Sequence, residues 1–187
     1  MSKPAIENAR ETAARKVRRE ERGGKFLTFF LAGEEYGLEI LKVQEIIGIM
    51  DITPVPRTPE HIRGVINLRG KVIPIVDLRL KFLMESAERT SESCIIVVEA
   101  NRVQTGIVVD KVSEVLDVLG ENIEDAPNFG ADVRTDYILG IGKSEGHVKL
   151  LLDIDRVMSE EDLEQLAAAY GDAGEEAPIE EEAVSVA

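Results

Sequence analysis

Short apolar runs rich in Val and Ile recur along the chain, bounded by Gly and polar residues, and this pattern predicts a mainly β protein. The clearest pair is Val65–Leu68 and Val72–Leu78, separated only by Arg69-Gly70-Lys71. Gly70 can adopt the positive φ that a tight hairpin turn requires. We therefore expect a β-hairpin with Arg69 at its tip, where no neighbouring residue in the sequence offers an acidic partner.

Three more strand pairs follow from the same pattern of short apolar runs. They cover Phe26–Ala32 with Tyr36–Ile40, Cys94–Val98 with Val103–Val109, and Tyr137–Ile141 with Val148–Ile154. Between strands, apolar residues at helical spacing predict short helical turns over Lys42–Met50 and Lys111–Val118, and Thr58–Ile62 resembles a one-turn helix. A C-terminal helix is expected over residues 159–171, beginning at Ser159 and ending at Gly171.

Two halves of the chain resemble each other, which predicts an internal duplication. Tyr36–Ile46 matches Thr105–Val115 at a shift of 69 residues, with Gly, Lys, Val and Glu coinciding. Further on, a Gly precedes an Asp by 13 residues in both halves, as Gly64 and Asp77 and as Gly140 and Asp153. Each pseudo-repeat, about 26–84 and 92–158, is too small to bury itself well. Two copies should therefore pack around a shared core as small barrels.

The repeat separates structural residues from residues with a particular role. Asp77 and Asp153 occur at the same place in both copies, as do Gly70 and Gly146, so we expect them to shape turns and strand ends. Arg69 becomes Glu145 in the second copy. The hairpin itself therefore does not need Arg69, and a specific binding role or pairing is expected for it.

Charge narrows the possible partners. The 187 residues carry a net charge of −14, distributed as +4 over residues 1–25 and −10 over residues 160–187. An acidic body argues against nucleic acid and anionic lipid, and no apolar run is long enough to cross a membrane. We expect a disordered or frayed helical basic arm over residues 1–24 and a disordered acidic tail over residues 172–187.

The chain shows no catalytic constellation, and an enzyme or a cofactor is not expected. His61 and His147 read as solvated surface residues, and Cys94 reads as a packed thiol. Asp77, Asp153 and Asp155 leave one alternative open, a small barrel that binds a metal or other ligand. Turn chemistry is the simpler explanation for these carboxylates.

An apolar segment after the second strand remains unexplained. It contains Val43, Ile46, Ile47, Ile49 and Met50. One face of a helical turn can enter the core, but not all of these side chains can. The segment either packs partly against a loop or presents a hydrophobic face that docks a partner helix.

At these residues the chain strongly resembles the CheW family of bacterial chemotaxis coupling proteins. The matching stretches are Glu35–Ile46, Ile62–Gly70, Val72–Arg79, Thr105–Asp110 and Val112–Leu116, within a similarity from about Phe26 to Leu166. The resemblance implies two SH3-like five-stranded β-barrel subdomains packed around a shared core, with short helices and a C-terminal helix. It also implies a non-enzymatic cytoplasmic adaptor, monomeric when free, that joins the histidine kinase CheA to methyl-accepting chemoreceptors in arrays at the membrane.

The resemblance further implies two binding surfaces. The receptor tip would lie in a groove lined by Val43, Glu45, Ile46 and Arg69, and Gly64 and Gly106 match positions where a side chain would crowd the interfaces. A Glu45–Arg69 pair would supply the partner that Arg69 lacks locally. The regulatory domain of the kinase would contact Ile49, Met50, Ile52 and Val55 on one face and Phe129 on another. Asn128 stands where an acid is common in the family, so contacts at that loop depart from the pattern.

Overall fold

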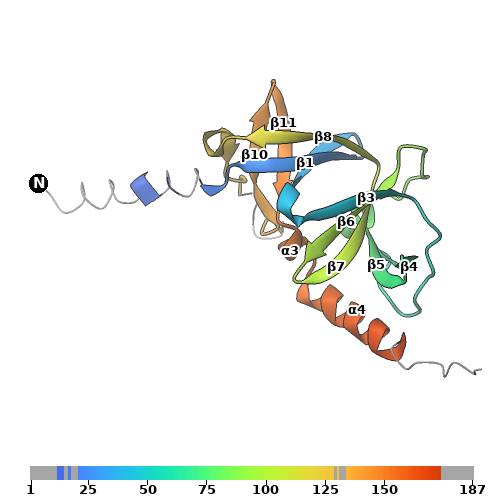
Figure 1. Ribbon diagram of the computed structural model, residues 1–187. Helices are drawn as coiled ribbons and strands as arrows, with labels where there is room; N and C mark the ends of the chain where they lie inside the picture. The colour runs from blue at the N-terminus through green and yellow to red at the C-terminus, as the bar shows by residue number, and fades with distance from the viewer. Residues whose placement is uncertain (1–11, 15–16, 18–20, 129, 131–133, 174–187) are drawn as a thin grey trace, which may run out of the picture.

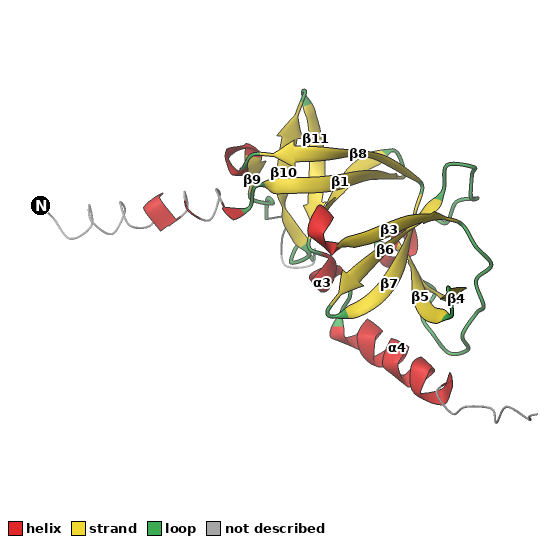
Figure 2. Ribbon diagram, viewed as in Figure 1, coloured by secondary structure: helices red, strands yellow, loops and turns green. Residues whose placement is uncertain are grey.

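The computed structural model describes residues 12–14, 17, 21–128, 130 and 134–173, which form two β-sheets and a few short helices. The strands and helices are distinguished in Figure 2, where β-structure dominates. The mainly β fold class is therefore confirmed. Most of the predicted basic arm and nearly all of the acidic tail lie outside the described residues, and their expected disorder stays a prediction.

The two sheets lie against each other (Figure 1). The six-stranded sheet has the order β8 (Lys111–Val118), β1 (Gly24–Leu31), β2 (Glu34–Glu39), β11 (His147–Leu152), β10 (Ile138–Ser144), β9 (Ile123–Glu124). The five-stranded sheet has the order β3 (Val43–Gly48), β6 (Cys94–Ala100), β7 (Val103–Val109), β5 (Lys71–Asp77), β4 (Ile62–Leu68). The helical segments are η1 (Ile40–Lys42), α2 (Leu78–Lys81), η2 (Gly120–Asn122), α3 (Ile154–Val157) and α4 (Glu160–Ala173).

Each sheet takes strands from both halves of the chain. The five-stranded sheet surrounds β6 and β7 of the second half with β3, β4 and β5 of the first, and the six-stranded sheet does the reverse with β1 and β2. In each sheet the two halves meet in one parallel pair, β5 with β7 or β11 with β2, and in one antiparallel pair, β3 with β6 or β8 with β1. The strand orders correspond element by element, as expected for a duplicated chain.

The expected helical turns at Lys42–Met50 and Lys111–Val118 are wrong, because Val43–Gly48 and Lys111–Val118 are strands. In β3 the partly buried residues alternate with exposed ones, which is the period of two of a strand. The backbone of β3 pairs with β6, and that of β8 pairs with β1. Apolar residues at positions 43, 46 and 47 match a helical spacing only because the run is short, and distant strand partners decide its conformation.

One of the two remaining helix predictions also fails. Residues 58–61 form no helix and Ile62 begins β4; the Thr58 hydroxyl donates to the carbonyl of Val55 at 2.9 Å and does not cap a helix. The C-terminal helix begins as expected, with Ser159 and Asp162 exchanging capping hydrogen bonds. It continues past Gly171 to Ala173.

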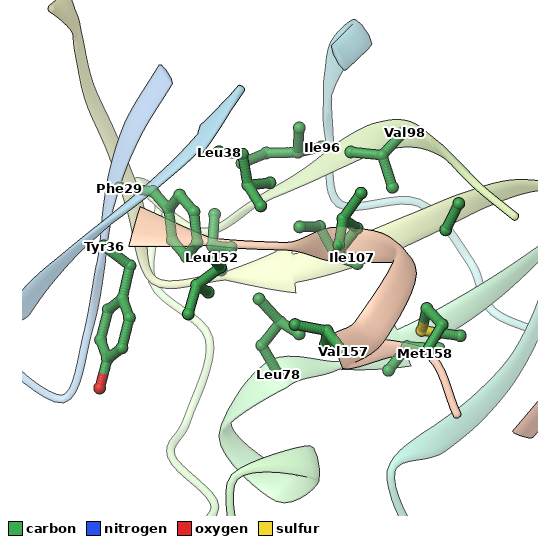
Figure 3. Close-up of a cluster of buried hydrophobic side chains, with 14 of the residues drawn as sticks. Phe29, Tyr36, Leu38, Leu78, Ile96, Val98, Ile107, Leu152, Val157 and Met158 are labelled. Carbon is green, nitrogen blue, oxygen red and sulfur yellow. The ribbon is translucent and has the colours of Figure 1, made fainter. Parts of the chain in front are cut away.

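A shared hydrophobic core lies between the sheets (Figure 3). Phe29 and Leu38 come from the six-stranded sheet, and Ile96, Val98 and Ile107 come from the five-stranded sheet; all five are fully buried. Each sheet also encloses a smaller apolar cluster of its own, around Ile66, Ile73 and Ile95 in one case and around Phe26 and Leu151 in the other. Burying each large side chain contributes about 1.5–3 kcal/mol. The shared core therefore stabilises the packing of the two sheets against each other.

The residues retained in both copies have the structural roles expected of them. Gly70 and Gly146 have φ of 82° and 78° in equivalent hairpin turns. Asp77 accepts a hydrogen bond from the Arg79 amide at 2.9 Å and caps α2, while Asp153 accepts from the Asp155 amide at 3.1 Å and caps α3.

Candidate protein-docking site

The predicted pair between Glu45 and Arg69 is present. The Arg69 guanidinium donates to both carboxylate oxygens of Glu45, with Nη1 to Oε1 at 2.9 Å and Nη2 to Oε2 at 3.0 Å. The hydrogen bonds from Arg69 hold the pKa of the Glu45 carboxyl below its usual range. Two parallel charge-assisted bonds fix the relative orientation of the groups as well as their distance.

This pair joins the two edges of one sheet. Glu45 lies on β3 and Arg69 follows β4, and these strands stand at opposite ends of the five-stranded order. The sheet must therefore curl until its edges approach each other. Arg69 and Gly70 both have positive φ, 53° and 82°, which is the geometry of a type I′ hairpin turn. The turn thus positions the guanidinium, and the curvature of the sheet brings the carboxylate to it.

Apolar surface accompanies the ion pair. The alternation of β3 leaves Ile46 exposed at 46%, while Ile47 packs against the cluster inside the five-stranded sheet. Val43 is half-buried and packs against the shared core. Of the four residues expected to line the receptor groove, Ile46 and Arg69 are therefore exposed, whereas Glu45 and Val43 are partly covered.

Gly64 and Gly106 are buried, so any effect of these positions on a partner would act through the fold. At Gly64, where φ is 133°, a Cβ atom would lie 2.0 Å from the carbonyl oxygen of Thr53. Thr53 and Val65 exchange two backbone hydrogen bonds of 2.9 Å there, which hold the connection between β3 and β4 against the edge of the sheet. At Gly106 a Cβ atom would lie 2.5 Å from the Ile75 side chain.

The segment expected to contact the kinase is mostly folded onto the protein. Ile49 and Ile52 are partly buried against the interior of the five-stranded sheet, and Val55 is half-buried. Met50 is exposed at 38%. Phe129 lies outside the described residues, so its expected kinase contact stays a prediction.

The alternative metal or ligand site is not supported. Asp77 and Asp153 cap different helices, and Asp155 binds Lys42 Nζ at 2.8 Å and the Asn101 amide at 2.8 Å. Across the part of the chain that the structure describes, no three His, Cys, Asp or Glu side chains come together as metal ligands would.

Sequence reasoning missed a cluster beneath α4. His61 was expected to be solvated, but its side chain is only 19% exposed and Nε2 lies 2.5 Å from Asp162 Oδ1. Lys81 donates to the other carboxylate oxygen. Burial alone would raise the pKa of Asp162, but the hydrogen bonds from Lys81, His61 and Ser159 outweigh it and lower the pKa to about 2. The capping pattern at Ser159 marked Asp162, but nothing local indicated its distant partners.

The predictions for His147 and Cys94 agree with the structure. His147 is exposed near the tip of the second hairpin. Cys94 is partly buried at the start of β6, and burial raises the pKa of its thiol, as expected for a packed and unreactive cysteine. Among the described residues, no helix has the length and apolar character that crossing a membrane would require.

A curled β-sheet with an orienting ion pair at its seam and exposed apolar residues nearby has the features of a surface that binds another protein. Comparison with known proteins gives the family. A profile described as the CheW-like domain matches residues 25–162. The chain belongs to the CheW family, whose members are non-enzymatic scaffolds.

Individual relatives agree with this assignment. The chemotaxis protein CheW of Klebsiella aerogenes is 42% identical over 141 residues, which cover 75% of this chain and 85% of that protein. The chemotaxis protein CheW of Rhizobium meliloti is 36% identical over 143 residues, 76% of this chain and 92% of that protein. The solved structure of the scaffolding protein TtCheW from Thermoanaerobacter tengcongensis matches with a TM-score of 0.68 at 34% identity, covering 75% of this chain and 95% of that one.

Proposed function

We propose that this protein is an adaptor that couples chemoreceptors to the histidine kinase CheA in chemotaxis signalling. Its surface around the Glu45–Arg69 pair would bind the helical tip of a receptor, and a separate surface would bind the regulatory domain of the kinase. The chain would work in the cytoplasm and be recruited to receptor arrays at the membrane. Membership of the CheW family supports the coupling role in general.

The bidentate pair is the observation that carries the receptor site. Arg69 is 73% exposed, yet both of its terminal nitrogens are oriented by Glu45, which is 27% exposed. An exposed ion pair contributes little to stability, so the first copy does not need this arrangement in order to fold. The second copy has Glu145 at the equivalent turn. A charged group held in a fixed direction beside exposed Ile46 is suited to orienting a partner helix.

The kinase surface would include Met50, which is exposed, unlike Ile49, Ile52 and Val55. Ile49 and Ile52, by packing inside the sheet, would fix the backbone on which Met50 is displayed. Phe129 would belong to a second contact. Because β3 ends at Gly48, the receptor and kinase surfaces would be adjacent in the fold while using different side chains.

The coupling role can be tested by gel filtration of the full chain with a chemoreceptor cytoplasmic fragment and the regulatory domain of CheA, separately and together. We expect a complex of all three components. Ile46→Asp should weaken receptor binding by about 1–3 kcal/mol, in the range of interface hot spots, and should leave kinase binding unchanged. Ile46 is a better test position than Val43, because Val43 packs against the core.

Val148→Asp is the matched control. Val148 is exposed at 56% on β11 of the other sheet, so the same introduced charge should leave receptor binding intact. Equal losses for both variants would argue against the site at Ile46. Absence of binding to either partner at tens of micromolar would overturn the adaptor assignment itself.

A further inference from the structure

One edge of the five-stranded sheet is basic although the protein is strongly acidic. From Arg57 to Lys71 the chain contains four basic residues and one acidic residue, against a net charge of −14 for the whole protein. Arg69 is paired with Glu45. The other three, Arg57, Arg63 and Lys71, are all exposed, and no ion pair or hydrogen bond engages their side chains within the described part of the chain. We call these three residues the basic strip.

The C-terminal segment has the opposite charge. Residues 174–187 contain five glutamates, Glu175, Glu176, Glu180, Glu181 and Glu182, and no Lys or Arg. They follow α4 directly, outside the described residues. An acidic segment tethered to a body with unpaired cations experiences a high local concentration of those cations, typically in the millimolar range for a short linker.

The structure anchors α4 close to the basic strip. Asp162, in the first turn of α4, binds the ring of His61, which lies immediately before β4, and Arg63 is two residues further along. The Thr58 hydroxyl donates to the carbonyls of Val55 and Ile62, at 2.9 and 3.4 Å, so the loop carrying Arg57 folds back to the start of β4.

The segment is long enough to return from the end of α4. Eleven residues separate Asp162 from Ala173, a helical length of about 17 Å. Seven extended residues beyond Ala173 would span about 24 Å. Arg63 is two residues from His61, so their Cα atoms are at most about 7 Å apart. The extended segment is longer than the helix, so Glu180, Glu181 and Glu182 can fold back toward Arg63 near the anchor.

We propose that the acidic segment 174–187 docks in cis on the basic strip formed by Arg57, Arg63 and Lys71. Because Lys71 and Arg69 flank the same turn, the docked segment would cover part of the proposed receptor site and compete with a receptor tip. This second consequence rests on the proposed function, whereas docking itself does not.

Docking can be measured on the full chain by comparing amide NMR spectra of the wild type with a variant in which all five glutamates of the segment are changed to Gln. At about 20 mM salt, where exposed charges interact over roughly 20 Å, amides of residues 57–71 should differ between the two proteins. The differences should disappear at about 500 mM salt, where screening reduces that range to less than 5 Å. Identical spectra over residues 57–71 at low salt would overturn the proposal.

A matched pair of background variants locates the contact. With Arg57, Arg63 and Lys71 all changed to Ser, neutralising the glutamates should no longer alter the amides of β4. With Arg89→Ser, an exposed arginine on the loop after α2, the wild-type difference should persist. Differences that survive loss of the basic strip would place the segment elsewhere and refute the docking site.

Receptor affinity tests whether the docked segment overlaps the proposed receptor site. Neutralising the five glutamates should tighten binding of a chemoreceptor fragment roughly three- to tenfold at low salt, as expected for the loss of a few competing exposed ion pairs. Amide differences without any change in affinity would retain docking and overturn its overlap with the receptor site. A fragment that binds neither protein would contradict the proposed function and leave the NMR result to decide docking alone.

Discussion

Arg69 and Glu45 form a bidentate ion pair across the seam where the two edge strands of the five-stranded sheet approach each other, with both bonds between 2.9 and 3.0 Å. No backbone ladder connects β3 with β4. The side chains therefore make the only hydrogen bonds recorded between these strands in the described residues. The ion pair holds the two strand edges together at this seam. Reversing the sign of either charge should therefore change how closely the edges approach each other.

Reversing one charge should loosen the seam, and reversing both should restore it. Arg69→Glu or Glu45→Arg would place like charges opposite each other, and amide hydrogen exchange in β3 and at the β4–β5 turn should accelerate. The double variant should return exchange close to the wild-type rate, with little change in melting temperature throughout. Arg63→Glu, an exposed position on β4 without a partner among the described residues, is the control. A double variant as fast as the single ones would show that the pair does not hold the seam.

Asp162 should make stability depend on pH in the acid range. Its pKa of about 2 in the folded protein lies below the ordinary value of 3.8. A depressed carboxyl pKa stabilises the fold above the unfolded pKa, and this contribution is lost as pH falls through the folded pKa. The loss between about pH 4 and pH 2 should be on the order of 2 kcal/mol.

Urea unfolding of the wild type and Asp162→Asn from pH 5 to pH 2 measures this contribution. The variant should be less stable at pH 5, and the gap in unfolding free energy should narrow as pH falls. Because both proteins share every other titrating group, the narrowing reports on Asp162. A gap that stays constant would contradict the assigned pKa.

Gly64→Ala should destabilise the protein more than Gly70→Ala. Gly70 has a φ of 82°, near the left-handed region that costs an Ala residue about 1–2 kcal/mol, whereas Gly64 has a φ of 133°, in a region that is essentially restricted to Gly. A Cβ at Gly70 meets nothing within 4 Å, whereas a Cβ at Gly64 would overlap the Thr53 carbonyl. Thermal unfolding of the two variants should therefore show the larger loss at Gly64, where backbone strain and collision act together. Equal losses would mean that the loop around Thr53 moves aside at no cost.

The six-stranded sheet contains a buried ion pair that the duplication allows to be replaced. Lys149 on β11 is 9% exposed and lies 3.0 Å from Glu35 on β2 and 3.7 Å from Glu114 on β8. The five-stranded sheet carries Ile73 at the position equivalent to Lys149 and Gln104 at the position equivalent to Glu35. The same fold therefore accommodates an apolar and a neutral residue in this arrangement.

Lys149→Ile alone should destabilise the protein by about 3 kcal/mol, because Glu35, whose side chain is only 15% exposed, would lose its cation. Adding Glu35→Gln should recover most of this loss in unfolding free energy. Lys143→Ile serves as the control, since Lys143 forms an exposed pair with Glu124 and its loss should cost little. A double variant no more stable than Lys149→Ile would contradict the role assigned to the buried pair.

The sequence by itself determined what depends on neighbouring residues. The hairpin around Gly70, the cap at Ser159, the turn roles of Asp77 and Asp153 and the similarity to the CheW family could all be predicted from short stretches. These features depend on φ preferences, on capping within a few residues and on local motifs. The Glu45–Arg69 pair was also expected, but through family resemblance and not from spacing.

Only the tertiary structure decided what depends on distant partners. Lys42–Met50 was expected to be helical and is mostly strand, because β6 supplies its hydrogen bonds. His61 was expected in solvent but is covered by α4, where it contacts Asp162. That partner lies 101 residues away in the sequence, so no local pattern indicated it. The division of strands between the two sheets has the same origin. The spacing of apolar residues predicts which side chains are buried. Several long-range strand pairings could bury the same side chains, and the packing of the whole chain selects one of them.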